Sequence, residues 1–338
     1  MKIKKLIRYP LVSVVIATYN SKNTLEKCLG SVRNQNYPQK KIEIIIADGS
    51  SKDNTREIAS RFKTTFLSIP AKMQNAEYNK GQGLRRAKGE FILMIDHDNV
   101  LPHEMWLKNM LFPLLANKNI VASETLRYHY DPKFSLLDRY FALFGAGDPL
   151  AFYLGKADRL SYIYSKYNLL GKAKRHKGYY IVEFKPDQVP TLGANGFLIR
   201  KETLIKNANV SGNNFFHIDV NVDLINKGHN LYAFVDDTVI HLTGYKSISS
   251  FLYRRKLFME QFYLKKNNNR RYSVYESRDL IKLILYVIYA LTIVKPLIDS
   301  FRGYAKIRDT AWFFHPVLAF SLCLIYGYTA LKAQIISK

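Results

Sequence analysis

Residues 90–99 read Glu-Phe-Ile-Leu-Met-Ile-Asp-His-Asp-Asn and join an apolar run to a polar end with two carboxylates. The run from Glu90 to Ile95 is typical of a strand buried on both faces of a parallel sheet. Asp96 and Asp98 lie one residue apart, so in extended backbone their side chains point the same way. This pair suits a hard cation, Mg²⁺ or Mn²⁺, which keeps coordination positions open for substrate phosphates.

Strands and helices alternate upstream of this segment. Strands are predicted at Leu11–Ala17, Ile42–Ala47 and Thr65–Ile69, and helices at Asn23–Gln35, Lys52–Phe62 and Asn75–Ala87. In the first helix, apolar residues at positions 25, 28, 29 and 32 follow the helical spacing, and Asn23 is available as the N-cap. The alternation predicts a doubly wound, mainly parallel α/β sheet flanked by helices.

Polar clusters follow three of these strands. They are Thr18-Tyr19-Asn20, Asp48-Gly49-Ser50 and Asp96-His97-Asp98. Ligands of doubly wound sheets bind beyond the C-terminal ends of the strands. We therefore expect the three clusters to meet at one edge and form a binding site.

The remainder of the chain is less regular. Residues 128–180 are rich in tyrosine, lysine and glycine and are interpreted as an insertion or lid. Further strands are predicted at Pro190–Arg200 and Asn230–Val235, around a helix at Val220–Lys227. We predict one domain over residues 1–245, with a donor-binding half at about 10–125 and an acceptor half at about 126–245. Residues 246–338 are predicted to be a basic linker followed by membrane-associated helices.

The net charge of +24 is large, with 51 Lys and Arg against 27 Asp and Glu in 338 residues. Such an excess implies an anionic partner, either nucleic acid, an anionic membrane or a phosphorylated substrate. The sequence contains no helix-turn-helix, zinc-finger or RNA-recognition signature, so we expect no nucleic-acid partner. The 24 Tyr and 20 Phe favour sugars or lipid headgroups.

The cysteines and the N-terminus give information on the cellular compartment in which the protein is expected. Cys28 and Cys323 are nearly 300 positions apart and show no metal-ligand spacing, which favours a reduced, cytoplasm-facing chain. The basic N-terminus, Met1 to Lys5, precedes an apolar run of only a single strand's length. We therefore expect neither a signal peptide nor an N-terminal membrane anchor.

Two apolar segments stand near the C-terminus. Leu283–Val294 has only 12 residues, whereas the 21 residues of Ala311–Leu331 carry no formal charge and could cross ~30 Å of hydrocarbon. Aromatic residues near the ends of the second segment suit a membrane interface, and the basic linker before it suits anionic headgroups; these residues are Trp312, Tyr326, Tyr328, Arg302, Lys306 and Arg308. A buried helix pair is the alternative, and spanning and surface-lying arrangements both stay open.

Several ordered motifs resemble glycosyltransferase family 2, whose members are inverting enzymes with a GT-A type nucleotide-binding fold. The resemblance covers about residues 10–245 and is most specific in the first hundred. Its motifs are Val12–Asn20, Cys28–Val32 with Gln35-Asn36-Tyr37-Pro38, Ala47–Thr55, and Gly83–Gly89 followed by Phe91–Asp98.

The resemblance implies roles for the polar clusters. Asp48 would accept a hydrogen bond from the nucleotide base, and Thr18, Tyr19 and Asn20 would line the nucleotide pocket. Asp98 would be the main metal ligand beside Asp96, which also contacts the donor. Gly193, Asn195 and Gly196, in the segment Gly193-Ala194-Asn195-Gly196, would form the acceptor-side loop.

The catalytic base is ambiguous in the sequence. Inversion requires a group that deprotonates the acceptor hydroxyl. The family usually has an acidic pair opening a helix that ends at a glycine, whereas this chain has Phe216-His217-Ile218-Asp219, with Gly228 as the glycine. Counting back from Gly228 places His217 at the position of the usual base. Asp219 is preferred as the base because it is a carboxylate; it could instead only cap the helix, and a histidine base is chemically acceptable.

Basic residues further along the chain suit the diphosphate of a nucleotide sugar. His241 is a candidate metal or diphosphate ligand, although a histidine at a strand end is often structural. Arg254 and Arg255 are candidates for diphosphate binding, because guanidinium groups match phosphate geometry. Residues 253–257, Tyr-Arg-Arg-Lys-Leu, lack the Gln-x-x-Arg-Trp signature of processive synthases, which favours transfer of one sugar.

These features predict a metal-dependent enzyme of cell-envelope glycan synthesis that is associated with an anionic membrane and has its catalytic domain in the cytoplasm. It would transfer one sugar, with inversion, from a nucleotide-diphosphate sugar to a lipid-linked or cell-surface glycan. Two alternatives stay open. One is a polyprenyl-phosphate glycosyl synthase, which needs no base. The other is a catalytically silent membrane scaffold, which the intact Asp96 and Asp98 pair disfavours.

Overall fold

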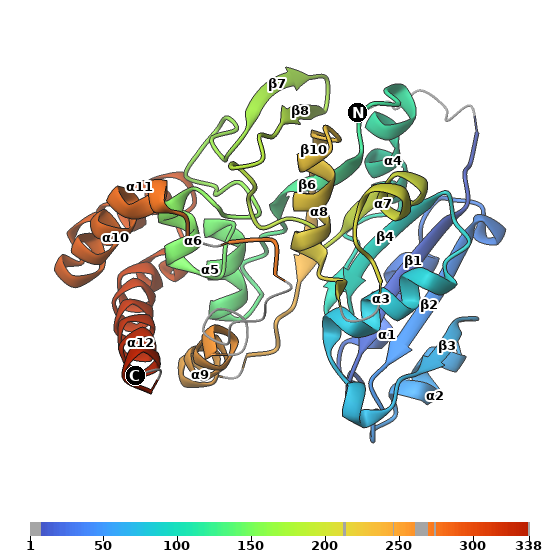
Figure 1. Ribbon diagram of the computed structural model, residues 1–338, viewed down its shortest axis with the longest axis horizontal. Helices are drawn as coiled ribbons and strands as arrows, with labels where there is room; N and C mark the ends of the chain where they lie inside the picture. The colour runs from blue at the N-terminus through green and yellow to red at the C-terminus, as the bar shows by residue number, and fades with distance from the viewer. Residues whose placement is uncertain (1–7, 212–213, 246, 261–269, 274, 337–338) are drawn as a thin grey trace. The chain divides into compact units, whose positions relative to one another are not determined.

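A computed structural model describes residues 8–211, 214–245, 247–260, 270–273 and 275–336. The described residues form two compact units (Figure 1). The first comprises the chain up to His129 together with Leu170–Leu242, and the second comprises Tyr130–Leu169 and the chain from Thr243 onward. Residues 130–169 thus group with the C-terminal helices and not with the sheet.

The first unit is a mixed, mostly parallel sheet flanked by helices. Its strands are β1 Val12–Thr18, β2 Ile42–Asp48, β3 Thr65–Ser68, β4 Phe91–Asp96, β5 Asn99–Val100, β6 Ala122–Tyr128, β7 Lys172–His176, β8 Tyr179–Glu183, β9 Phe197–Arg200 and β10 Leu231–His241. Its helices are α1 Leu25–Arg33, α2 Thr55–Ser60, α3 Ala76–Arg86, α4 Trp106–Ala116, α7 Lys201–Asn207 and α8 His217–Asn226. The predicted fold class is confirmed.

The strand order is β3-β2-β1-β4-β9-β6-β10-β8-β7, with β5 paired to β10 off this path. Strands β3, β2, β1 and β4 are mutually parallel, as Figure 1 shows. Strand β9 runs antiparallel between β4 and β6, and β10 runs parallel to β6. The parallel block brings the C-terminal ends of β1, β2 and β4 to one edge.

Burial explains why these segments form central strands. All seven residues of β1 are buried, and β2 and β4 are nearly as enclosed. Helix α3 packs on β1 and β2 and begins at Asn75, whose side chain accepts hydrogen bonds from Glu77 N at 2.9 Å and Tyr78 N at 3.3 Å. These two bonds satisfy amides that otherwise lack partners at a helix start, so α3 begins at a fixed residue.

Several predicted boundaries differ from the observed ones. Helix α1 has Thr24 rather than Asn23 at its N-cap, and the Thr24 side chain makes no capping bond. Strand β9 begins only at Phe197, because Gly193 and Gly196 adopt positive φ angles of 106° and 77° that interrupt extended backbone. Helix α8 begins at His217, earlier than predicted. Segment 128–180 is not structureless, since it contains two helices and the β7–β8 hairpin.

The second unit is helical and has an aromatic core. Its helices are α5 Leu136–Phe144, α6 Pro149–Leu154, α9 Ile248–Met259, α10 Leu280–Thr292, α11 Val294–Lys306 and α12 Phe314–Ile336, with short 3₁₀ turns η5 Ser277–Asp279 and η6 Thr310–Phe313. Trp312 and Phe144 lie edge to face with ring centroids 4.8 Å apart, and His315 stacks on Phe144 at 4.0 Å. Burial lowers the pKa of His315 to about 3, so this imidazole is a neutral part of the core.

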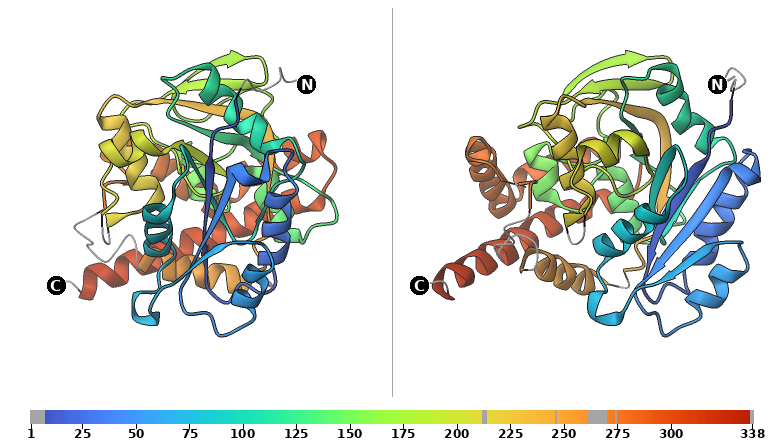
Figure 2. Two further views of the ribbon diagram at one scale, coloured as in Figure 1. Left: turned by 90° about the vertical axis from the view of Figure 1, so that its right-hand side faces the viewer. Right: turned by 45° about the vertical axis from the view of Figure 1, so that its right-hand side comes forward.

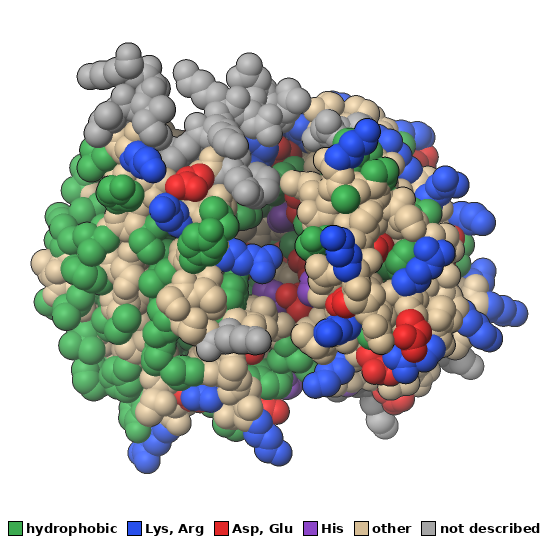
Figure 3. Space-filling view, turned by 90° about the horizontal axis from the view of Figure 1, so that it is seen from below, with side chains coloured by type: hydrophobic (Ala, Val, Ile, Leu, Met, Phe, Trp, Pro, Cys, Tyr) green, Lys and Arg blue, Asp and Glu red, His purple; other side chains and the backbone are tan. Residues whose placement is uncertain are grey.

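The three C-terminal helices expose apolar side chains on their outer faces (Figure 3). Within the described residues, one helix, Thr310–Lys332, is long and apolar enough to cross a membrane; it is the long C-terminal helix in Figure 2. Helices α10 and α11 meet that criterion only together, and they bend by 82° at their junction. The predicted C-terminal apolar helix is therefore present.

Candidate functional site

The sheet register brings the predicted polar clusters together. Thr18 pairs with Asp48 across β1 and β2, and Ala17 pairs with Asp96 across β1 and β4. The first, second and fourth strands therefore end at the same level. The convergence expected from strand order is present in the structure, so one sheet edge carries all three clusters.

Asp48 lies at the centre of a hydrogen-bonded turn. Its carboxylate accepts from Thr18 Oγ1 at 2.8 Å, from Ser51 N at 2.8 Å and from Ser51 Oγ at 2.5 Å. Asn20, at a φ of 51°, accepts from Lys52 N at 2.9 Å and links the two turns, while Tyr19 is exposed. A carboxylate offers about four acceptor positions, so Asp48 retains one for the N–H of a ligand.

Asp96 and Asp98 have different partners. Asp96 Oδ1 lies 2.8 Å from Lys80 Nζ, whereas Asp98 Oδ2 lies 3.5 Å from His241 Nε2. Asn99 Nδ2 donates to Asp98 Oδ1 at 3.3 Å. Burial alone would raise the pKa of Asp98, but the neighbouring His241 outweighs it and lowers the pKa to about 2. Asp98 is therefore a carboxylate at neutral pH.

The metal ligands available from Asp96, Asp98 and His241 suit a cation that takes most of its other ligands from a substrate and water. In the part of the chain that the structure describes, no three His, Cys, Asp or Glu side chains gather as a ready-made metal cluster. Asp98 and His241 nevertheless face one another, and Asp96 lies two residues away along the chain. Mg²⁺ is often held by one or two carboxylates together with phosphates and water. The residues present fit a metal of this kind.

Lys80 and Glu77 form an ion-pair network that the sequence did not predict. The Lys80 side chain is only 3% exposed, and its Nζ lies 3.6 Å from Glu77 Oε1 in addition to its contact with Asp96. Burial disfavours the ammonium form, but Asp96 and Glu77 outweigh burial and raise the pKa of Lys80. The sequence did contain an indication of this network. Residues 77, 80, 81 and 84 have the helical spacing of a buried face, and two of them are charged, which indicates a buried ion pair.

The predicted acceptor loop lies beside the metal motif. Asn195 Oδ1 accepts from Asn99 Nδ2 at 3.1 Å, and Asn195 Nδ2 donates to the Tyr128 hydroxyl at 2.9 Å. The Tyr128 and His241 rings are 5.6 Å apart between centroids. Gly196 N donates to Met94 O in β4 at 3.1 Å, which ties the loop to the strand that ends at Asp96.

Both candidate bases lie in the first turn of α8. His217 Nδ1 is 2.8 Å from Glu77 Oε1, and His217 N donates to Glu77 Oε2 at 2.9 Å. The His217 side chain is 16% exposed, whereas Asp219 as a residue is only 1% exposed. Gly193 lies directly behind them, since a Cβ there would come within 2.6 Å of His217 O. The first turn of α8 and the acceptor loop are thus in contact.

Arg254 and Arg255 belong to α9 in the second unit. Arg255 Nε donates to the Tyr326 hydroxyl at 2.9 Å, and its guanidinium also pairs with Asp148. Arg254 lies over the Tyr245 ring at 6.0 Å from its centroid. Diphosphate binding by the two arginines stays a prediction.

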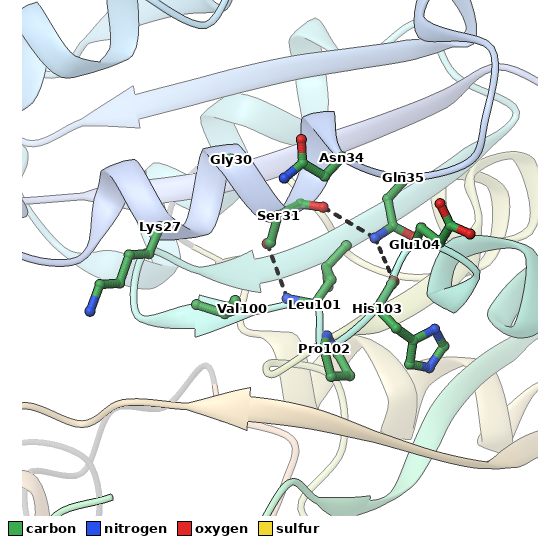
Figure 4. Close-up of a pocket in the computed structure, with 10 residues that line it drawn as sticks. All are labelled: Lys27, Gly30, Ser31, Asn34, Gln35, Val100, Leu101, Pro102, His103 and Glu104. Atoms are coloured by element: carbon green, nitrogen blue, oxygen red, sulfur yellow. Dashed lines mark hydrogen bonds between the residues drawn. The ribbon is translucent and has the colours of Figure 1, made fainter. Parts of the chain in front are cut away.

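A surface hollow on the first unit is lined by none of the predicted site residues. It is formed by α1 and the segment from Val100 to Glu104 (Figure 4). Ser31 Oγ accepts from Leu101 N at 3.0 Å, and Gln35 Nε2 donates to Ser31 O and His103 O at 3.1 and 2.9 Å. These hydrogen bonds hold the segment after β4 against α1 and thereby support the Asp96–Asp98 turn.

Comparison with known proteins gives the family of the N-terminal half of the chain. The family model described as glycosyl transferase family 2 matches residues 13–176, which include the first three polar clusters. This stretch belongs to glycosyl transferase family 2. The predicted family is confirmed.

Glycosyltransferase relatives match the N-terminal part. The glycosyltransferase AglE of Haloferax volcanii is 34% identical over 103 residues, which are 29% of this chain and 34% of that protein. A GalNAc(5)-diNAcBac-PP-undecaprenol beta-1,3-glucosyltransferase of Campylobacter jejuni is 35% identical over 98 residues, 27% of this chain and 31% of that protein. The matches thus span about a third of these two relatives.

A solved structure shares the fold over nearly the whole chain. A mannosyltransferase of Pyrobaculum calidifontis, in complex with GDP-Man and Mn²⁺, superposes with a TM-score of 0.54 at 16% identity and covers 98% of this chain and 89% of that one. The likeness shows that this chain has the GT-A fold.

Proposed function

We propose that this chain transfers a single sugar from a nucleotide-diphosphate sugar to a lipid-linked or cell-surface glycan, with inversion at the anomeric carbon. The observation that carries the proposal is the common sheet edge at which Thr18, Asp48 and Asp96 end their strands. That edge combines an acceptor for a base N–H with carboxylates suited to a metal–diphosphate group.

Each end of the donor has a partner of suitable chemistry. The free acceptor position of Asp48 binds an N–H of the nucleotide base. Asp98 and His241, with Asp96 beside them, would hold Mg²⁺ or Mn²⁺ at the diphosphate. The metal, when bound, stabilises the negative charge that develops on the leaving nucleoside diphosphate. The Mn²⁺ in the structurally similar mannosyltransferase supports this assignment.

The transfer itself is a single displacement. The acceptor oxygen forms a bond to the anomeric carbon while the bond from that carbon to the diphosphate oxygen breaks, and the hydroxyl proton passes to a base. The base is Asp219 or His217, both in the first turn of α8 beside Gly193. A lipid phosphate as acceptor would need no base, and the product would then be a polyprenyl-phosphate sugar.

Membrane association follows from the outer faces of α10, α11 and α12. Their exposed apolar side chains recur at helical spacing, as in Ile281, Ile284, Ile288 and Leu291 of α10. Over residues 280–332 the two acidic side chains are buried, so every exposed charge is basic. An apolar face with basic residues suits an anionic lipid surface. The catalytic unit would lie on the cytoplasmic side, where nucleotide sugars and Mg²⁺ are available and where free cysteines such as Cys28 stay reduced.

A donor screen tests the function. Thermal-shift measurements with a panel of nucleotide sugars and Mn²⁺ should identify a donor that stabilises the protein by about 3 kcal/mol at a hundredfold excess over Kd. Asp98→Ala should abolish that stabilisation and sugar transfer, and Asp236→Ala, an exposed carboxylate of the same unit, should preserve both. Mass spectrometry of the product distinguishes a glycan from a lipid-phosphate acceptor. Unchanged transfer by Asp98→Ala would refute the proposed metal site.

Vesicle sedimentation tests the membrane assignment. The protein should bind vesicles that contain anionic phospholipid more tightly than purely zwitterionic ones, and salt should weaken the binding. Ile284→Asp should reduce binding, because it places a charge within the apolar face of α10. Equal binding to both vesicle types would contradict the electrostatic part of the proposal.

A further inference from the structure

Glu77 uses both of its carboxylate oxygens on one residue of α8. Oε2 accepts from His217 N at 2.9 Å, and Oε1 lies 2.8 Å from His217 Nδ1. The two residues are 140 positions apart in sequence, and the Glu77 side chain is only 11% exposed. The Nδ1 contact is short but poorly aligned as a hydrogen bond, as catalytic contacts often are before the acceptor binds.

This contact determines which imidazole nitrogen of His217 can act. A carboxylate only accepts hydrogen bonds, so the nitrogen opposite Glu77 must carry the proton. Burial alone would raise the pKa of Glu77, but His217 and Lys80 outweigh it and lower the pKa to about 2. Glu77 is therefore ionised throughout the neutral range. In the neutral form of His217 this tautomer has its lone pair on Nε2, and a general base needs such a lone pair.

The accessibility of the two candidates also differs. The 16% exposure of the His217 side chain leaves a path for an acceptor hydroxyl, whereas Asp219 at 1% is enclosed. The loop at Gly193 contacts the backbone of His217, so an acceptor bound at that loop would lie near the first turn of α8.

We propose that His217 is the general base of the transfer and that Glu77 is its positioning residue; this inference rests on the proposed function. The acceptor hydroxyl gives its proton to His217 Nε2 while its oxygen bonds to the anomeric carbon and the nucleoside diphosphate departs. Glu77 holds the tautomer and stabilises the imidazolium that forms, as the aspartate does in a Ser-His-Asp triad.

Lys80 connects this pair to the donor side of the site. It lies between Glu77 and Asp96, at 3.6 and 2.8 Å, so the buried ammonium group links the end of β4 to Glu77, the residue that contacts the start of α8. The base is thereby fixed relative to the strand that carries the metal motif. Pre-organisation of this kind keeps reacting groups aligned before the reaction begins.

The decisive variant is Glu77→Gln. The glutamine carbonyl can still accept from His217 N, but the amide then directs an N–H toward Nδ1 and favours the wrong tautomer. With the identified donor and a hydroxyl acceptor, kcat should fall roughly 10²- to 10⁴-fold, the range for loss of a general base or its tautomer. The dissociation constant of the donor, measured by calorimetry with Mn²⁺, should change by less than about threefold. Glu77 is not proposed to contact the donor, so only a small indirect effect on donor binding is expected.

A double-mutant cycle separates positioning from a merely structural role. If Glu77 acts through His217, the double variant Glu77→Gln/His217→Ala should be no slower than His217→Ala alone. Combining Glu77→Gln with Asp219→Asn should instead multiply the two separate effects. External imidazole should restore part of the activity of His217→Ala. This rescue experiment tests the proposal even if Glu77→Gln does not fold.

The results distinguish this inference from the function on which it rests. A wild-type protein that transfers no sugar from any donor refutes the proposed function. Wild-type transfer with undiminished kcat in Glu77→Gln overturns the inference alone. Multiplying effects of Glu77→Gln and His217→Ala, or His217→Ala activity that imidazole does not raise, also overturn it. A lipid-phosphate product formed at full rate by His217→Ala would show that no base is used.

Discussion

Replacing Lys80 with methionine tests whether the buried ion-pair network stabilises the first unit. Methionine retains an unbranched apolar stem but removes the ammonium group between Asp96 and Glu77. In the wild type that group is 2.8 Å from Asp96 Oδ1 and 3.6 Å from Glu77 Oε1, in a side chain 3% exposed. Lys80→Met therefore leaves two carboxylates without their shared cation.

The size of the effect follows from the exposure of the two carboxylates. Removing one partner of a buried ion pair costs about 3–5 kcal/mol. The Asp96 side chain is 31% exposed and can regain water, and Glu77 retains its contacts with His217. The cost should thus lie near the lower end, at about 3 kcal/mol. For a cooperative unit of this size, Tm should fall by roughly 6–12 °C.

Urea unfolding and calorimetry measure the change against a matched control. Lys206→Met removes a lysine that is 69% exposed and paired with Glu202 one helical turn away, and it should cost less than about 0.5 kcal/mol. Adding Asp96→Asn to Lys80→Met should recover part of the loss, because it neutralises the more exposed stranded charge. If Lys80→Met behaves like Lys206→Met, the network does not stabilise the fold and this reasoning is wrong.

Three further changes have expected outcomes. Gly193→Ala should lower the free energy of unfolding by about 1–3 kcal/mol in urea titrations, because φ is 106° and the added Cβ meets an α8 carbonyl at 2.6 Å. Glu77→Gln should make the free energy of unfolding, measured by urea titration, depend less steeply on pH below about pH 5. The pKa of Glu77 is lowered to about 2, so its contribution is complete above about pH 5, and about 3 kcal/mol is lost as the pH falls to 2. Gly303→Ala should cost about 1–3 kcal/mol in calorimetry, because its Cβ would lie 2.3 Å from the Trp312 ring. Gly327→Ala, which meets no atom within 4 Å, is its control and should be neutral or stabilising.

The convergence of the three polar clusters could be predicted because its determinants are local. Strands such as Val12–Thr18 and Phe91–Asp96 are continuous apolar runs, and the polar clusters follow them directly in sequence. Parallel pairing then fixes which residues meet, so Thr18, Asp48 and Asp96 converge without long-range information. The same locality explains why the family motifs in this part are specific.

The features that the sequence did not predict depend on contacts between residues far apart in the chain. A lysine within a helix usually indicates a solvated face, and only the structure pairs Lys80 with Asp96. The strand predicted at Pro190–Arg200 is shorter than its sequence suggests, because two glycines with positive φ bend the backbone into the predicted acceptor loop. The preference of a residue for helix or strand contains no information on such contacts between distant segments.

The start of α8 shows how a departure from a family motif can preserve its chemistry. The usual acidic pair is absent there, and this departure left the alternative of a catalytically silent scaffold open. In space, however, a carboxylate is present: Glu77 of α3 contacts His217 twice, from 140 residues earlier in the chain. An imidazole backed by a buried carboxylate can accept a proton where a lone carboxylate otherwise would. If His217 acts in this way, the altered segment retains a group able to act as a base, and the departure from the motif does not by itself argue for a scaffold.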